Sequence, residues 1–168
     1  MYRSETAETL AYREVVPYGM LYGHRVYLVA AFPWAEEPVN YRLDRMNDVR
    51  VSEAVGTRPR DFNLNAYAAR SFGVFQEEPH DVVLRFNPAV ADEVAAFQFH
   101  PTQTLTREAD GSTIVAFRAG GLREMAWHLF MWEEEVRIVT PHELCEVMEH
   151  LVRASQDALE QMKSRRRN

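Results

Sequence analysis

The first third of the chain alternates short apolar stretches rich in Val, Tyr and Leu with turn residues such as Pro17, Gly19 and Gly23. Apolar runs punctuated in this way are typical of β-strands. The pattern predicts four strands at hairpin spacing, over residues 15–18, 25–30, 41–45 and 49–51. Consecutive short hairpins favour a small antiparallel barrel, and the proline at position 17 indicates an edge strand or a bend.

A short helix is predicted over residues 62–73, where Gly73 would close its C-terminal end. The segment from Gln76 to Asp81 is polar and contains Pro79, which is the composition of a domain boundary. We therefore expect two domains, residues 1–75 and residues 76–168.

The second half of the chain alternates predicted strands and helices. Asn87 followed by Pro88 indicates a helix start, because asparagine caps well and proline is tolerated in the first turn. Asp110 and Gly111 form a strong hairpin signal. The predicted strands cover residues 82–86, 104–108, 113–118 and 136–139, and the helices cover residues 87–97 and 122–130. This βαββαβ order predicts a ferredoxin-like module, and the whole chain is expected to be α+β.

A long C-terminal helix is predicted to follow the last strand, because Thr140, Pro141 and Glu143 supply a cap, a first-turn proline and the glutamate of a capping box. Its apolar stripe consists of Leu144, Val147, Met148, Leu151, Ser155, Leu159 and Met162. The stripe can pack on the sheet of its own module or on a partner, and packing on its own core is the commoner outcome.

Charge is distributed unevenly along the chain. The net charge is −6, yet residues 1–72 hold nine arginines and nine acidic residues, so the acidity belongs to the second half. Lys163 is the only lysine. Arginine suits phosphate and stacks on bases, but the same preference follows from codon bias in a GC-rich genome.

Neither a membrane segment nor a disulfide is expected. No apolar run approaches the roughly 20 residues of a membrane-spanning helix. The single cysteine, Cys145, has no partner for a disulfide or a zinc site. These features favour a soluble protein in a reducing cytoplasm.

Catalytic and metal-binding signatures are absent from the sequence. No serine, cysteine or threonine stands in a recognisable nucleophile motif. The six histidines form no pair at the three- or four-residue spacing of helix ligands. The acidic run Glu133–Glu135 is interpreted as a solvated turn. We expect no catalytic residues, no metal and no cofactor, and a nuclease would need a carboxylate cluster with a divalent cation.

The predicted barrel strands carry the best candidate ligand residues. Tyr27 alternates with Val26 and Leu28, so it faces the other side of its strand. Arg42 and Arg45 alternate likewise, and both can reach one ligand only near a bend or a strand end. Arginines and exposed tyrosines suit a ligand with phosphates and bases. The alternative is that Arg42 forms a surface ion pair with Asp44 or Glu36.

Several short motifs, in the same order and spacing, resemble the WYL domain of bacterial transcriptional regulators. They are found at residues 2–4, 13–22, 26–30 and 41–46. Residues 71–73, 83–86, 110–112 and 136–141 resemble the C-terminal extension that usually follows that domain. The resemblance covers nearly the whole chain.

The resemblance implies an Sm/SH3-like barrel that senses an effector, often a nucleotide or single-stranded nucleic acid, in a regulator that is usually dimeric. Carried over by position, the implied ligand-binding residues are Ser4, His24, Arg25, Tyr27, Arg42 and Arg45, and Tyr18 is a further candidate ligand residue. Two positions depart from the family pattern. Val26 replaces the tryptophan of the name motif, and Glu133 stands where the extension usually has a glycine after Trp132.

The N-terminal helix-turn-helix usual in the family is missing from this sequence, so the chain looks like a fragment. Duplex DNA would be a partner only through that missing part. Our hypothesis is the effector-binding and dimerising half of a bacterial transcription regulator, with short single-stranded DNA as the effector. The alternative is a sensor of a nucleotide or another small phosphorylated or carboxylated metabolite.

Overall fold

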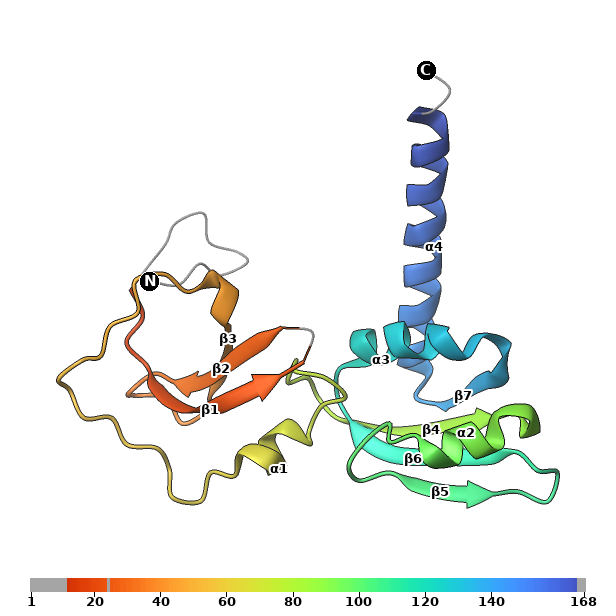
Figure 1. Cartoon of the computed structure of the whole chain (residues 1–168), viewed down its shortest axis with the longest axis horizontal. Helices are drawn as coiled ribbons and strands as arrows, with labels where there is room; N and C mark the ends of the chain where they lie inside the picture. The colour runs from red at the N-terminus through yellow and green to blue at the C-terminus, as the bar shows by residue number, and fades with distance from the viewer. Residues whose placement is uncertain (1–11, 24, 166–168) are drawn as a thin grey trace. The chain divides into compact units, whose positions relative to one another are not determined.

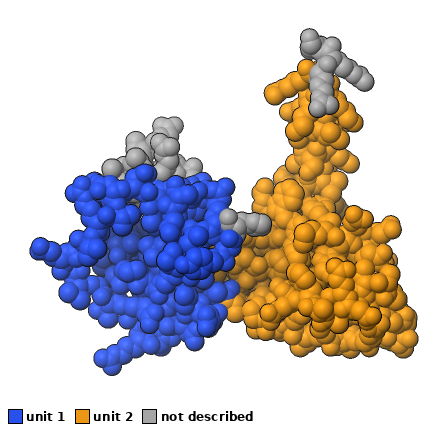
Figure 2. Space-filling model, viewed as in Figure 1, with its two compact units in different colours: residues 1–68 blue, residues 69–168 orange. Residues whose placement is uncertain are grey.

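The computed structural model describes residues 12–23 and 25–165 (Figure 1). The chain divides into two compact units, residues 1–68 and 69–168 (Figure 2). Each unit contains one antiparallel sheet, so the fold is α+β, as the sequence predicts. Over the described residues, no helix combines the length and the apolar character needed to cross a membrane.

The first unit is built on a three-stranded sheet in the order β1-β2-β3. Its elements are β1 (Val16–Tyr22), β2 (Val26–Ala31), β3 (Val39–Arg42) and the short helix α1 (Leu64–Ala68). Pro17 lies in the edge strand β1, and the register of β1 against β2 shifts between Pro17 and Gly19. The predicted edge position and bend are both confirmed.

Three predicted elements of the first unit differ from the structure, two in their bounds and one entirely. The strand expected over 41–45 ends at Arg42 and continues as the 3-10 turn η1 (Leu43–Arg45). Residues 49–51 form no strand, and Val51 is 99% exposed. Helix α1 ends at Ala68 instead of Gly73, where a Cβ would collide with the side chain of Glu124.

The core of the first unit lies on one face of its sheet. Tyr18, Val29, Ala31 and Tyr67 are buried together there. Tyr67 comes from α1, so this short helix covers that face. The opposite face carries the cross-strand pair Leu28 and Tyr41.

The second unit has a four-stranded sheet in the order β5-β6-β4-β7. Its strands are β4 (His80–Phe86), β5 (Thr104–Arg107), β6 (Thr113–Ala119) and β7 (Val136–Thr140). Its helices are α2 (Ala91–Ala96), α3 (Leu122–Leu129) and α4 (His142–Arg165), with 3-10 segments η2 (Pro88–Val90) and η3 (Phe130–Glu135). The predicted βαββαβ order with a terminal helix is confirmed.

The core of the second unit lies between the sheet and its helices. Leu84 and Phe86 of β4 point into it and are fully buried, as are Met125 and Leu129 of α3. Leu144 joins this core from the first turn of α4. Alternate burial along β4 is the pattern of a sheet covered on one face.

Backbone conformation bears on three positions that the sequence singled out: Gly111, Asn87 and Glu133. Gly111 has φ 86°, as expected for the Asp-Gly turn between β5 and β6. Asn87 occupies the cap position of η2, but no capping hydrogen bond forms, and its side chain instead donates to the carbonyl of Glu134. Glu133 has φ 49° and ψ −127°, a conformation that glycine favours.

Candidate functional site

One end of the three-stranded sheet gathers the arginines that the sequence singles out. A hairpin joins β1 to β2 there, between Tyr22 and Val26, which are cross-strand partners. Strand β3 is antiparallel to β2, and Tyr27 pairs with Arg42 at the same end. Arg25, Arg42, Asp44 and Arg45 are together called the arginine site below.

Asp44 holds two of these arginines on a single carboxylate. Arg42 donates from Nε to Oδ1 at 3.0 Å and from Nη2 to Oδ2 at 2.6 Å. Arg25 donates from Nη1 to Oδ2 at 2.8 Å. The ion pair between Arg42 and Asp44, which the sequence left open as the alternative to ligand contact, is therefore present.

The two guanidinium groups differ in exposure. The side chain of Arg42 is 17% exposed, whereas those of Arg25 and Asp44 are about half exposed, at 52% and 51%. The bidentate contact and partial burial fix the orientation of Arg42. Arg25 and Asp44 remain accessible to solvent, so an anion can approach this ion-pair network from outside.

The tyrosines expected at the site are not exposed. Tyr18 and Tyr27 are each only 6% exposed, so the expectation of open tyrosine rings is wrong for both. The ring of Tyr18 lies 4.8 Å from that of Phe62, within the core of the first unit. Ser4 and His24 lie outside the described residues. Arg45 is partly buried in η1.

An exposed aromatic ring that the sequence did not single out stands at this end of the sheet. Tyr22 is the last residue of β1 and is 77% exposed. Trp34 is equally exposed, at 78%, but it lies in the β2–β3 connection at the opposite end of the sheet and stacks on Phe32. Strand alternation could not identify Tyr22, because its exposure depends on the hairpin that follows.

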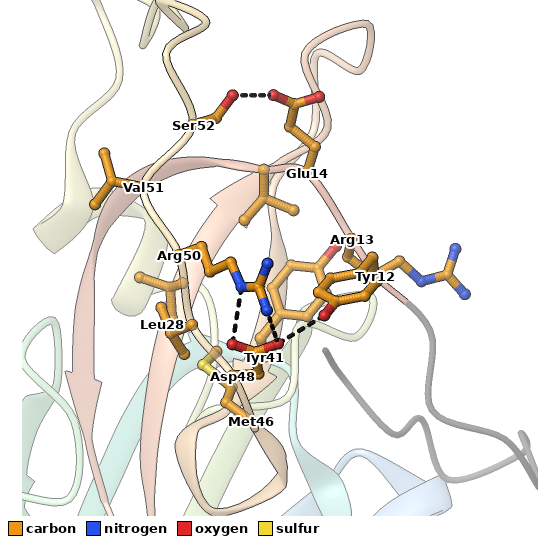
Figure 3. A pocket seen from close by; sticks show the side chains of 12 residues that line it. Tyr12, Arg13, Glu14, Leu28, Tyr41, Met46, Asp48, Arg50, Val51 and Ser52 are labelled. Carbon is orange, nitrogen blue, oxygen red and sulfur yellow. Dashed lines mark hydrogen bonds and ion pairs between the residues drawn. The ribbon is translucent and has the colours of Figure 1, made fainter.

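The face opposite the core of the first unit contains a pocket of about 440 Å³ (Figure 3). Leu28 and Tyr41 lie on this face of the sheet. The lining residues are Tyr12, Arg13, Glu14, Val15, Leu28, Tyr41, Met46, Asp48, Val49, Arg50, Val51 and Ser52. Most of this lining is apolar or aromatic, and the volume suits a small organic molecule.

Polar contacts connect the two chain segments that border this pocket (Figure 3). Tyr12 Oη donates to Asp48 Oδ2 at 2.6 Å, and Arg50 donates to both oxygens of Asp48 at 2.9 and 2.8 Å. Ser52 Oγ donates to Glu14 at 2.8 Å. The hydrogen bonds from Arg50 and Tyr12 lower the pKa of Asp48, and the bond to Asp48 raises the pKa of Tyr12.

Sequence reasoning missed this pocket because its polar residues come from irregular segments. Asp48 has φ 51°, a left-handed conformation that asparagine and aspartate tolerate better than most residues. The Asn47-Asp48 dipeptide is the only sequence signal for that turn. It does not identify Tyr12 as the partner, because the two residues are 36 positions apart.

The described part of the chain contains no group of three or more histidine, cysteine, aspartate or glutamate side chains able to hold a metal ion. In the acidic run, Glu133 and Glu134 are exposed in η3, between α3 and β7. The interpretation of this run as a solvated turn agrees with the exposure of Glu133 and Glu134 but not with Glu135, which is half-buried and has a buried Oε2 atom.

Comparison with protein families identifies the class to which this architecture belongs. Residues 1–51 match the WYL domain, and residues 78–156 match the WCX domain. The two matches cover most of the chain and include every residue of the arginine site. The chain therefore contains a WYL domain followed by a WCX domain.

Among solved structures, the chain is similar to proteasome accessory factor B/C (PafBC) of Arthrobacter aurescens, with 20% identity and a TM-score of 0.38. The match covers 93% of this chain but only 24% of that protein, so this chain spans about a quarter of its length. No curated protein sequence matches the chain.

Proposed function

We propose that this chain is the effector-sensing half of a WYL-type bacterial transcription regulator and that it binds its effector without catalysing a reaction. In this proposal the first unit is an Sm/SH3-like barrel and the second is a ferredoxin-like module. The family matches support the proposal. The sheet order β5-β6-β4-β7, with helices in both crossovers, agrees with the ferredoxin-like assignment.

The proposed effector is short single-stranded DNA, bound at the arginine site. The observation that carries this proposal is the convergence of Arg25 and Arg42 on one carboxylate at the end of the sheet. Guanidinium groups in that arrangement fit a phosphate, which accepts the same paired hydrogen bonds as Asp44. Tyr22, exposed at the same end, offers a ring on which a base can stack.

Asp44 acts in this proposal as an internal stand-in for the phosphate. It keeps the two guanidinium groups oriented in the absence of effector and competes with the effector for them. A phosphate that displaces Asp44 exchanges one anion for another, so the arginines never lose their partner. Removing the carboxylate should therefore increase the affinity for an anion, since both competition and like-charge repulsion disappear.

Fluorescence anisotropy of a labelled short single strand tests the arginine site directly. Arg42→Ala and Arg45→Ala should each weaken binding, and Asp44→Asn should strengthen it. Arg118→Ala is the matched control, because Arg118 also forms an exposed ion pair, with Asp81 of the second unit. Unchanged affinity in both Arg42→Ala and Arg45→Ala would exclude this site.

A second pair of variants tests base stacking in the same assay. Tyr22→Ala should weaken binding by about 1–3 kcal/mol, the usual contribution of one stacked base. Trp34→Ala removes a similarly exposed ring at the other end of the sheet and should have no effect. Equal losses in the two variants would contradict the placement of the strand at the arginine end.

The pocket of about 440 Å³ favours a second candidate function, the sensing of a nucleotide or other small metabolite. Ligand binding to the native state raises the temperature of unfolding. A thermal-shift panel of mononucleotides, small carboxylates and oligonucleotides therefore separates the two functions. Stabilisation by a mononucleotide that Leu28→Trp abolishes would assign sensing to the pocket, and stabilisation by oligonucleotides alone would assign it to the arginine site.

The remaining parts of the proposal concern the whole regulator. We propose that it works in the bacterial cytoplasm as a homodimer and contacts duplex DNA through a helix-turn-helix outside this sequence. These partners follow from the family resemblance.

A further inference from the structure

The distal half of helix α4 has no packing partner among the described residues of its own unit. Leu144 and Leu151 are buried in the core of the second unit, but every residue from Val152 to Arg165 is exposed. Figure 1 shows this part of α4 extending beyond the body of that unit. At 1.5 Å per residue, these fourteen residues span roughly 21 Å.

Apolar side chains form a stripe along this exposed segment. Val152, Leu159 and Met162 are 40%, 51% and 62% exposed, and Ser155 lies between them. The spacing of three, four and three residues is that of a coiled-coil seam. A helix of this length is marginal in water without packing on its apolar stripe, so the stripe is expected to meet a partner.

We infer that the distal half of α4 pairs antiparallel with the same segment of a second copy of this chain. This inference rests on the homodimer in the proposed function and names its surface. In the antiparallel register that joins Val152 to Met162 of the other copy, Ser155 meets Leu159. The stripe is therefore complementary to itself, as a two-fold symmetric contact requires.

The charges beside the stripe favour the antiparallel direction. In the same register, Glu149 of one helix lies beside Lys163 of the other, at the flanking positions where interhelical ion pairs form. Parallel pairing would instead place the two basic ends next to each other, each containing Lys163 and Arg165. Opposite charges attract and like charges repel at this range, which selects the antiparallel arrangement.

Sedimentation equilibrium of the full chain tests this surface. Lys163→Glu and Glu149→Lys should each raise the dimer dissociation constant about tenfold, because each change creates two like-charge contacts per dimer. The double variant Glu149→Lys/Lys163→Glu should restore the wild-type value. Asp157→Lys is the matched control: it makes an equal charge change on the side of α4 away from the stripe, so its effect should be small. Leu159→Glu should give a monomer.

Circular dichroism of each variant checks that it is folded, which is expected because all the substituted side chains are exposed. Restoration of the dimer by the double variant supports the antiparallel pairing. A dimer that persists unchanged in Leu159→Glu and Lys163→Glu overturns this surface but leaves the homodimer proposal standing. A wild-type chain that stays monomeric throughout the micromolar range overturns both this surface and the homodimer proposal. Oligonucleotide binding is measured in a separate experiment, so its outcome does not depend on dimer formation.

Discussion

Replacing Glu133 by glycine should stabilise the second unit. Glu133 has φ 49° and ψ −127°, where a Cβ is strained, and its side chain is exposed. Such a conformation costs a non-glycine residue about 1–3 kcal/mol. Glycine adds about 0.5–1 kcal/mol of unfolded-state entropy, which offsets part of the gain. The expected net effect of Glu133→Gly is therefore a gain of about 1 kcal/mol in the free energy of unfolding.

Urea unfolding followed by tryptophan fluorescence measures this gain. Trp132 is the adjacent residue and is only 8% exposed, so its emission reports on the packing of this region. Glu134→Gly is the matched control, because Glu134 is also exposed in η3 but is not among its non-helical residues. It should destabilise the unit by about 0.5–1 kcal/mol. A loss of stability in Glu133→Gly as large as that in Glu134→Gly would refute the assignment of strain to position 133.

Two further predictions concern the core of the second unit. Burial lowers the pKa of His100 and His128, and His128 accepts a hydrogen bond from Trp132 Nε1, so folding favours the neutral form of both imidazoles. As pH falls through the ordinary histidine pKa of about 6.5, the unfolded chain therefore binds more protons than the folded chain. The free energy of unfolding should decrease from pH 7.5 to 5.5 as a result. The decrease is at most about 1.4 kcal/mol per pH unit for each histidine. Urea titrations at several pH values measure this slope, and a flat profile would contradict it. Leu84→Ala should lower the free energy of unfolding by about 2–5 kcal/mol, because Leu84 is fully buried between the sheet and its helices. Urea unfolding measures this loss, and a loss under about 1 kcal/mol would mean that the core repacks around the cavity.

The second unit could be predicted from the sequence more fully than the first. Its strands and helices follow clear hydrophobic periods, and strong local signals such as Asp110-Gly111 mark their ends. In the first unit, strand β3 stops at Arg42 and residues 49–51 pair with no described strand. Local propensity favours a strand at those positions, but pairing partners decide the outcome, and a single sequence does not show them.

The candidate site, too, could be predicted from the sequence only in part. The resemblance named Arg25 and Arg42 as ligand residues, and strand order then fixes their backbones at one end of the sheet. It did not predict that Asp44 would hold both guanidinium groups, nor that Tyr27 would be buried, because those features depend on side-chain packing across strands. Tyr22 was missed because its exposure depends on the hairpin that follows β1.

The salt dependence of oligonucleotide binding tests the central claim most directly. Each phosphate that the protein neutralises contributes about −0.7 to the slope of log affinity against log salt concentration for a single strand. Arg25 and Arg42 share one phosphate in this proposal and Arg45 contributes a second, so the predicted slope is about −1.4. The double variant Arg25→Ala/Arg42→Ala removes the shared phosphate and should make the slope shallower by about 0.7. Equal slopes for the wild-type protein and this double variant, or wild-type binding that does not change with salt, would contradict recognition of a phosphate at the arginine site.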